Sequence, residues 1–145
     1  EGKMSKSENE MNTLYLADSD EMIRKKIMKA KTDQGPETPN SAKPDYIQNL
    51  FTLLKLVSTT DAVTVFEEQF NQSSAGNCVI RYGDLKKQLA QDMISFIAPI
   101  RQKAEDILAN RDYLAGIMRH GKEKARASAD ETLQLVRKAI GVTYY

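Results

Sequence analysis

Apolar residues recur every three or four positions over most of this 145-residue chain, and this spacing constrains the possible folds most strongly. The pattern places apolar side chains along one face of an amphipathic helix. It occurs at about residues 18–31, 44–57, 60–70, 82–109 and 112–141, and strand-like alternation is almost absent. The sequence therefore predicts an all-α fold, a helical bundle of about five helices that follows an N-terminal loop arm.

Local signals predict where these helices begin, end and bend. The expected N-caps, whose side chains would accept backbone hydrogen bonds, are Asp18, Thr60 and Asp112. Gly141 is the expected C-cap of the last helix, and Pro99 is expected to kink the fourth. We expect the last helix to bury an apolar stripe with small residues in its middle: Leu114, Ile117, Met118, Gly121, Ala125, Ala129, Leu133, Val136 and Ile140.

Charge and rare residues exclude several classes of function. The net charge is +1, which argues against a polybasic binder of DNA, although residues 73–145 carry +4 and residues 1–72 carry −3. Cys78 and His120 are the only residues of their types, so no disulfide, cysteine-rich zinc site or multi-histidine site can form within the chain. We predict no protein metal site. The apolar runs are short, which predicts no membrane segment and a cytoplasmic location.

Residues 3–7 are the part of the sequence most informative about chemistry. They read Lys3-Met4-Ser5-Lys6-Ser7. Two lysines three positions apart, flanked by hydroxyls, can meet a triphosphate and offset the charge that develops as pyrophosphate leaves. Short stretches of lysine and serine are common, so the spacing by itself favours a solvated polar segment.

The same five residues match letter for letter the KMSKS loop of class I aminoacyl-tRNA synthetases. The chain also resembles bacterial-type tryptophanyl-tRNA synthetases along nearly its whole length, in the same order and at similar spacing. The matching segments are residues 12–16, 23–33, 49–50, 82–87, 121–126 and, near the end, 133–141. The chain departs from the family at residues 37–43 and at residues 73–80, and residues 73–80 resemble a small insertion. Neither departure touches the chemistry.

The resemblance implies roles for the loop. In the family the loop closes on ATP, a substrate that carries its own magnesium, during activation of the amino acid. Carried over, Lys6 is the main electrostatic residue and Lys3 supports it. Met4, Ser5 and Ser7 shape the loop and contribute contacts to the nucleotide. The family also needs a HIGH-type motif and a tryptophan pocket, which these 145 residues lack, so we expect the chain alone to be inactive.

The resemblance also implies a division of labour along the chain. Residues 1–17 would contain the loop and the end of the catalytic domain. Residues 18–145 would form a C-terminal helical domain that recognises the anticodon region of tRNA(Trp). At about 100° per residue, one flank of the last helix, beside its apolar stripe, carries Arg119, Lys122, Arg126 and Arg137. We predict this flank as the RNA surface. An ordinary solvated face, in which the aliphatic parts of lysine and arginine side chains cover the edge of the core, would show the same pattern.

Two alternatives stay open from the residues. The chain could derive from a tyrosyl-tRNA synthetase, a near relative whose C-terminal region differs in organisation. It could also be a non-enzymatic helical module that binds RNA or protein, which would leave residues 3–7 unexplained. For the synthetase we expect tRNA, ATP and tryptophan as partners and a homodimer at full length, because the family dimerises through its catalytic half. The 145-residue chain is expected to be a monomer.

Overall fold

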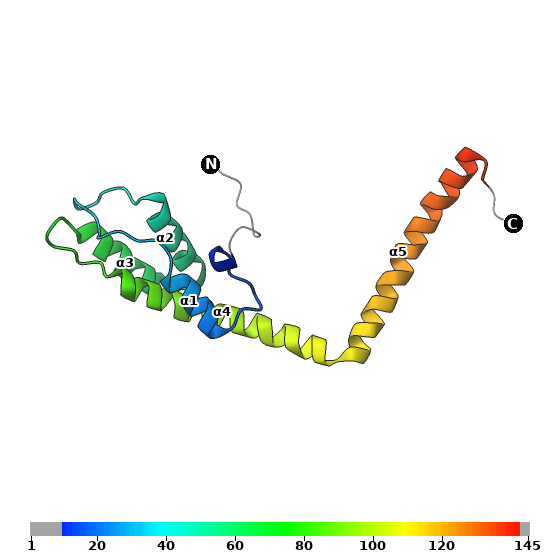
Figure 1. The fold of residues 1–145 in the computed structure, drawn as a ribbon, viewed down its shortest axis with the longest axis horizontal. Coiled ribbons are helices and arrows are strands. Elements are labelled where there is room, and N and C mark those ends of the chain that lie inside the picture. The colour runs from blue at the N-terminus through cyan, green and yellow to red at the C-terminus, as the bar shows by residue number, and fades with distance from the viewer. Residues whose placement is uncertain (1–9, 143–145) are drawn as a thin grey trace. The chain divides into compact units, whose positions relative to one another are not determined.

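The structure, a computed structural model, describes residues 10–142 (Figure 1). A short 3-10 helix η1 (Glu10–Asn12) comes first, followed by α1 (Asp20–Met28), α2 (Asp45–Val57), α3 (Thr60–Gln72), α4 (Tyr82–Ala109) and α5 (Arg111–Ile140). Within residues 10–142 there is no strand, only an isolated β-bridge between Ser74 and Asn77. The all-α prediction is confirmed, whereas η1 lies where a loop was expected.

The chain divides into two compact units, residues 1–101 and residues 102–145. Helix α4 remains one helix from Tyr82 to Ala109 with Pro99 inside it, so its last turns belong to the second unit. This structural boundary after residue 101 differs from the functional boundary predicted after residue 17. The predicted boundary separates the end of a catalytic domain from a tRNA-binding domain, and it stays a prediction.

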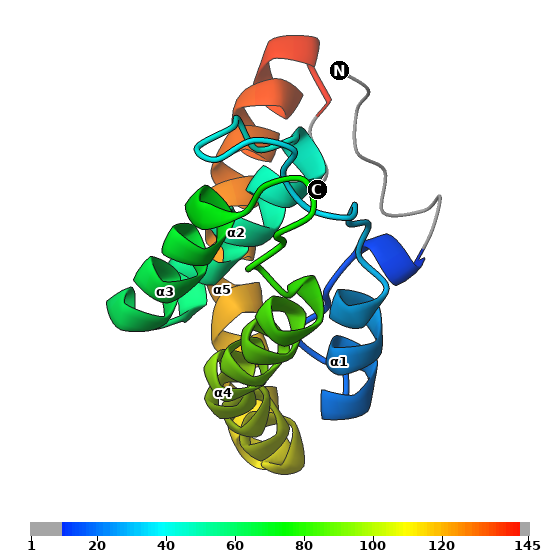
Figure 2. The same cartoon turned by 90° about the vertical axis from the view of Figure 1, so that its left-hand side faces the viewer.

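The core of the first unit comes mainly from α1, α2 and α4, with one large contribution from α3. Its buried apolar residues are Ile23, Ile27, Ile47, Leu50, Phe51, Leu54, Phe70, Ile80, Tyr82, Leu85, Leu89, Ala90, Met93, Ile94 and Ile97. Helices α2 and α3 lie side by side (Figure 1, Figure 2). Between them Phe51 and Phe70 pack edge to face, with ring centroids 5.9 Å apart and planes at 80°. Such burial is the main stabilising contribution in a domain of this size.

Lys43, in the loop before α2, places its ammonium group against these two rings. The Lys43 ammonium lies 4.7 Å from the ring centroid of Phe51 and 4.6 Å from that of Phe70. It also pairs with Glu67 of α3 at 2.6 Å, and Lys55 of α2 pairs with the same carboxylate at 2.8 Å. Burial works to raise the pKa of Glu67, but the hydrogen bonds from the two lysines prevail and hold it below its usual value.

The three predicted N-caps are wrong by one or two positions. The residues that cap α1, α3 and α5 are Ser19, Thr59 and Asn110, whose side chains accept from the backbone amides of Met22, Ala62 and Tyr113 at 3.2, 3.4 and 3.0 Å. An N-cap must lie just outside the helix, so that its side chain can reach back to the first free amides. Thr60 and Asp112 already lie inside their helices. The predicted C-cap is confirmed, because Gly141 ends α5 in the left-handed region at φ 72°.

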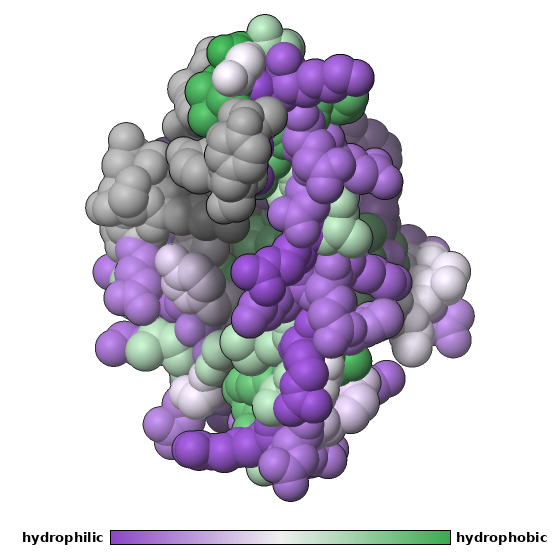
Figure 3. Space-filling view, turned by 90° about the vertical axis from the view of Figure 1, so that its right-hand side faces the viewer, coloured by the Kyte–Doolittle hydropathy of each residue, from purple (hydrophilic) through white to green (hydrophobic). Residues whose placement is uncertain are grey.

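Helix α5 buries none of its residues, which contradicts the predicted burial of its apolar stripe. Ile117 is 53% exposed and Ile140 is 66% exposed, and only Leu114 of the stripe is half-buried. Figure 3 faces this helix and shows hydrophilic side chains along it, with apolar side chains in patches beside them. The physical reason is that a single long helix cannot cover its own apolar face, so periodicity identifies a stripe without identifying what packs on it.

Candidate functional site

The predicted ATP-contacting residues Lys3, Met4, Ser5, Lys6 and Ser7 lie outside the described residues, so their roles stay predictions. The structure does describe the polypeptide that leads away from them. After η1 the chain runs through residues 13–18, which we call the strap, and then enters α1. The strap has neither helix nor strand structure, and side chains from α1 and α4 hold it in place.

Lys26 of α1 is the central contact of the strap. Its side chain is only 3% exposed. The ammonium group donates to the backbone oxygen of Thr13 at 2.8 Å and to Oδ2 of Asp18 at 2.7 Å. It also lies 4.7 Å from the ring centroid of Tyr15. One buried cation therefore contacts the beginning, middle and end of the strap.

Asp18 forms a hydrogen bond within the strap and also connects the strap to α4. Its Oδ2 accepts from the backbone amide of Tyr15 at 3.0 Å, in addition to the bond from Lys26. Burial works to raise the pKa of Asp18, but the hydrogen bonds from Lys26 and Tyr15 outweigh it, so the pKa falls below its usual value. From α4, Arg101 donates to the backbone oxygen of Asp18 and pairs with Asp20 at 2.6 Å. We call Lys26, Asp18 and Arg101 the strap clamp.

Another buried lysine fixes the other end of α1. Lys86 of α4 donates to the backbone oxygen of Ala30 at 2.6 Å and to Oγ1 of Thr32 at 3.2 Å, with a longer contact to the backbone oxygen of Met28 at 3.4 Å. The carbonyls at the end of a helix lack partners within the helix, and Lys86 supplies one. Burial lowers the pKa of Lys86. Helix α1 is thus attached to α4 near both of its ends.

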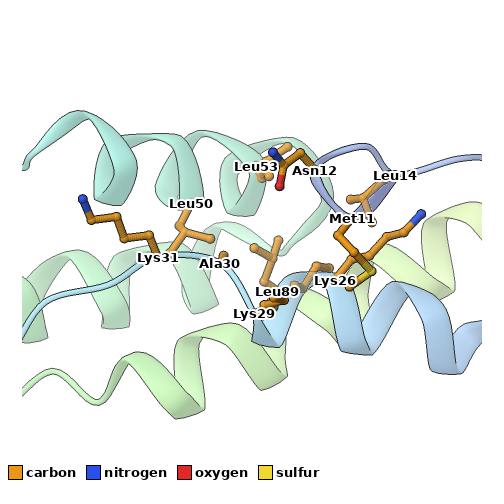
Figure 4. A pocket seen from close by; sticks show the side chains of 11 residues that line it. Met11, Asn12, Leu14, Lys26, Lys29, Ala30, Lys31, Leu50, Leu53 and Leu89 are labelled. Atoms are coloured by element: carbon orange, nitrogen blue, oxygen red, sulfur yellow. The ribbon is translucent and has the colours of Figure 1, made fainter. Parts of the chain in front are cut away.

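A pocket of about 400 Å³ opens between η1, the strap, α1, α2 and α4 (Figure 4). It is lined by Met11, Asn12, Leu14, Lys26, Ile27, Lys29, Ala30, Lys31, Leu50, Leu53 and Leu89. Figure 4 shows the ammonium groups of Lys26 and Lys31 pointing away from its middle, at opposite ends. The lining offers a largely apolar surface, and its cations are arranged around the edge. It holds no paired acid and base, so we assign it no catalytic role.

Other classes of site find no support in the part of the chain that the structure describes. Within residues 10–142, no three or more histidine, cysteine, aspartate or glutamate side chains are grouped so that they could hold a metal ion. None of the helices in that range has both the length and the apolar character needed to cross a membrane.

The four predicted RNA-binding residues Arg119, Lys122, Arg126 and Arg137 all lie on α5, and all are exposed. Because α5 is one continuous helix, the rotation of about 100° per residue places them on a single flank. Their arrangement on one flank therefore follows from the helix that the structure contains. Their contact with RNA is untested and stays a prediction.

Sequence reasoning missed three cations that hold the strap and α1, the buried Lys26 and Lys86 and the half-buried Arg101, and it assigned Asp18 to a cap. A signal was present for two of them. Lys26 lies at helical spacing from Ile23 and Ala30, and Lys86 from Tyr82 and Leu89, so each is a charged residue in an otherwise apolar stripe. A lysine in such a position is rarely buried without partners. The partners themselves are far away along the chain, and no local pattern indicates them.

Comparison with known proteins gives one consistent result. A family model described as tRNA synthetases class I (W and Y) matches residues 1–98. A tryptophan–tRNA ligase from Porphyromonas gingivalis is 49% identical over 140 residues, which is 97% of this chain and 41% of that protein. The tryptophan–tRNA ligase of Synechocystis is 36% identical over 143 residues, 96% of this chain and 40% of the relative. The chain thus spans about two fifths of the length of these relatives.

Proposed function

Because the chain belongs to the class I tRNA synthetases of the tryptophan and tyrosine family, we propose that it is part of a tryptophan–tRNA ligase. The full-length protein would activate tryptophan with ATP and transfer it to tRNA(Trp). The observation that carries this proposal is the 49% identity, over 97% of the chain, to a protein named tryptophan–tRNA ligase. The tyrosine alternative receives less support, since the relatives compared above carry the tryptophan name.

In this proposal residues 3–7 supply the charge that tryptophan activation requires. Attack of the tryptophan carboxylate on the α-phosphorus of ATP releases pyrophosphate, and negative charge builds up on the leaving group. Lys6, helped by Lys3, would neutralise that charge in the transition state. Met4, Ser5 and Ser7 would shape the loop and contact the nucleotide. Magnesium would arrive with ATP as part of the substrate and would help to offset the negative charge of its phosphates.

The helical part of the chain would bind tRNA(Trp), and the exposed basic flank of α5 is the proposed contact surface. Residues 73–145 carry the positive charge of the chain, +4 against −3 for residues 1–72. A basic surface attracts the phosphate backbone, and planar guanidinium groups can stack on unpaired bases. We further propose that the ligase acts in the cytoplasm, and that it is a homodimer at full length while the isolated 145-residue chain is a monomer.

Exchange of radioactive pyrophosphate into ATP tests the proposed reaction. We expect the full-length protein to catalyse exchange with tryptophan and not with tyrosine. The isolated 145-residue chain should catalyse none, because it lacks a HIGH-type motif. Its single histidine, His120, is followed by Gly121 and Lys122 and so does not begin such a motif. Faster exchange with tyrosine would favour the tyrosyl alternative. Full-length protein without exchange, although folded by circular dichroism, would favour a non-enzymatic module.

A further inference from the structure

We propose that the strap clamp of Lys26, Asp18 and Arg101 positions the loop at residues 3–7 for tryptophan activation, an inference that rests on the proposed function. The three residues touch neither ATP nor tryptophan in this proposal. They act through the strap, which connects the loop to the helical core. They are therefore positioning residues, and their effect should appear in the rate of adenylate formation.

The strap depends on side chains for its position. Residues 13–18 form no helix or strand, so no ladder of backbone hydrogen bonds defines where they lie. Leu14 packs against the core, but apolar contact is not directional. The directional contacts come from Lys26 to the Thr13 oxygen and from Arg101 to the Asp18 oxygen. These bonds hold the two ends of the strap.

The strap is close to the loop along the chain. Only five residues separate Ser7 from Thr13, so the bond to Thr13 fixes a point of the described backbone a short distance along the chain from the loop residues. Catalysis is sensitive to the placement of the groups that take part, since a misplacement of about 1 Å can cost on the order of 100-fold in rate.

Two residues of the clamp, Lys26 and Asp18, form an ion pair that is largely removed from water. The Lys26 and Asp18 side chains are only 3% and 10% exposed. Removing two charges from water costs free energy that offsets their attraction, so a buried ion pair is seldom a net stabiliser compared with apolar side chains. A methionine at position 26 would extend the apolar face formed by Ile23 and Ile27. It could not make the two directed hydrogen bonds to the strap.

The test uses the full-length enzyme with Lys26→Met, Asp18→Asn and, as matched control, Lys25→Met. Lys25 is a neighbouring lysine of α1 that is exposed and lies outside the clamp. Single-turnover adenylate formation and tryptophan binding are measured separately. We expect Lys26→Met to slow adenylate formation about 10–100-fold while the tryptophan dissociation constant stays within about threefold. Asp18→Asn should act in the same direction, and Lys25→Met should match the wild type.

A double variant separates positioning from general damage. If Lys26 works by placing the loop lysines, its loss should matter much less in a Lys6→Ala enzyme, so the two effects should not multiply. Multiplicative effects, or a wild-type rate in a folded Lys26→Met or Asp18→Asn protein, would overturn the inference. Failure of both clamp variants to fold would also overturn it, because the clamp would then be a stability element. A wild-type enzyme without tryptophan-dependent exchange would instead reject the proposed function.

Discussion

Gly35 shows how backbone conformation and packing can restrict a single position together. Its φ of 111° lies in a region that side chains of L-residues rarely adopt. A Cβ at this position would lie 2.5 Å from Sγ of Cys78, closer than two such atoms can approach. The turn is also held by a hydrogen bond from the Gly35 amide to Asp33 at 2.8 Å. A substitution here must therefore disturb both the turn and the segment that precedes α4.

We predict that Gly35→Ala lowers the free energy of unfolding by about 2–5 kcal/mol, because backbone strain contributes about 1–2 kcal/mol and overpacking about 1–3 kcal/mol. Gly76→Ala is the matched control, because its φ is 81° but its Cβ would meet open space. It should cost only the strain, about 1–2 kcal/mol. Adding Cys78→Ala to Gly35→Ala should recover the steric part. Urea denaturation followed by circular dichroism measures all four proteins, and equal losses at both glycines would contradict the steric explanation.

The sequence predicted little of this arrangement. Gly35 was only a loop marker, and Cys78 was only a lone thiol, since their contact joins positions 43 residues apart along the chain. The same holds for the buried Lys26 and the half-buried Arg101, whose bonds to the strap became visible only with the fold. Local patterns report the type of a residue and its neighbours along the chain. They do not report which distant group will satisfy a buried charge.

The helices themselves were predictable to within a few residues. Helices α2, α3 and α4 fill almost the expected ranges, because apolar spacing is a local property and each helix packs one face on the core. Their first residues were less predictable, since an N-cap depends on the backbone angles of one residue. Thr59 and Thr60 are adjacent and chemically identical, and only Thr59 has the extended backbone of a cap, at φ −69° and ψ 152°.

These adjacent threonines provide a test of the cap. We predict that Thr59→Ala lowers the free energy of unfolding by about 1 kcal/mol, because the amide of Ala62 loses its side-chain acceptor. Thr60→Ala should cost less than about 0.5 kcal/mol, since position 60 already lies inside the helix, where alanine has the higher helix propensity. Thermal unfolding of the two variants under identical conditions makes the comparison. A larger loss of stability for Thr60→Ala than for Thr59→Ala would support Thr60 as the cap, as first predicted from the sequence.

The positively charged side chains of the chain are of two kinds, some buried and others exposed. In the first unit, cations such as Lys26 and Lys86 are buried and bonded to the backbone, so they are unavailable to an external anion. In the second unit, the cations of α5 are exposed. Net charge predicted an excess of positive charge in residues 73–145 without distinguishing these two uses. Surface accessibility, which only a structure provides, shows that the cations of α5 are exposed, as are Lys25, Lys29 and Lys87 of the first unit, so contact between α5 and RNA stays a prediction.

We predict that the double variant Arg119→Gln, Arg126→Gln of the full-length enzyme lowers kcat/KM for tRNA(Trp) about tenfold and leaves pyrophosphate exchange unchanged, because tryptophan activation needs no RNA contact. The salt dependence should also weaken. Each phosphate contact to a single strand contributes about 0.7 to the slope of log K against log salt, so losing two should reduce it by about 1.4.

Lys124→Gln is the matched control for charge, since about 100° of rotation per residue turns Lys124 to the opposite side of α5 from Arg119 and Arg126. It removes one positive charge from an equally exposed stretch of the same helix. Aminoacylation assays over a range of tRNA and salt concentrations compare the variants. A loss as large for Lys124→Gln as for either single arginine variant would mean that general charge, not this flank, attracts the tRNA. An unchanged kcat/KM in the double variant would establish that the flank is an ordinary solvated face whose arginine stems cover apolar surface.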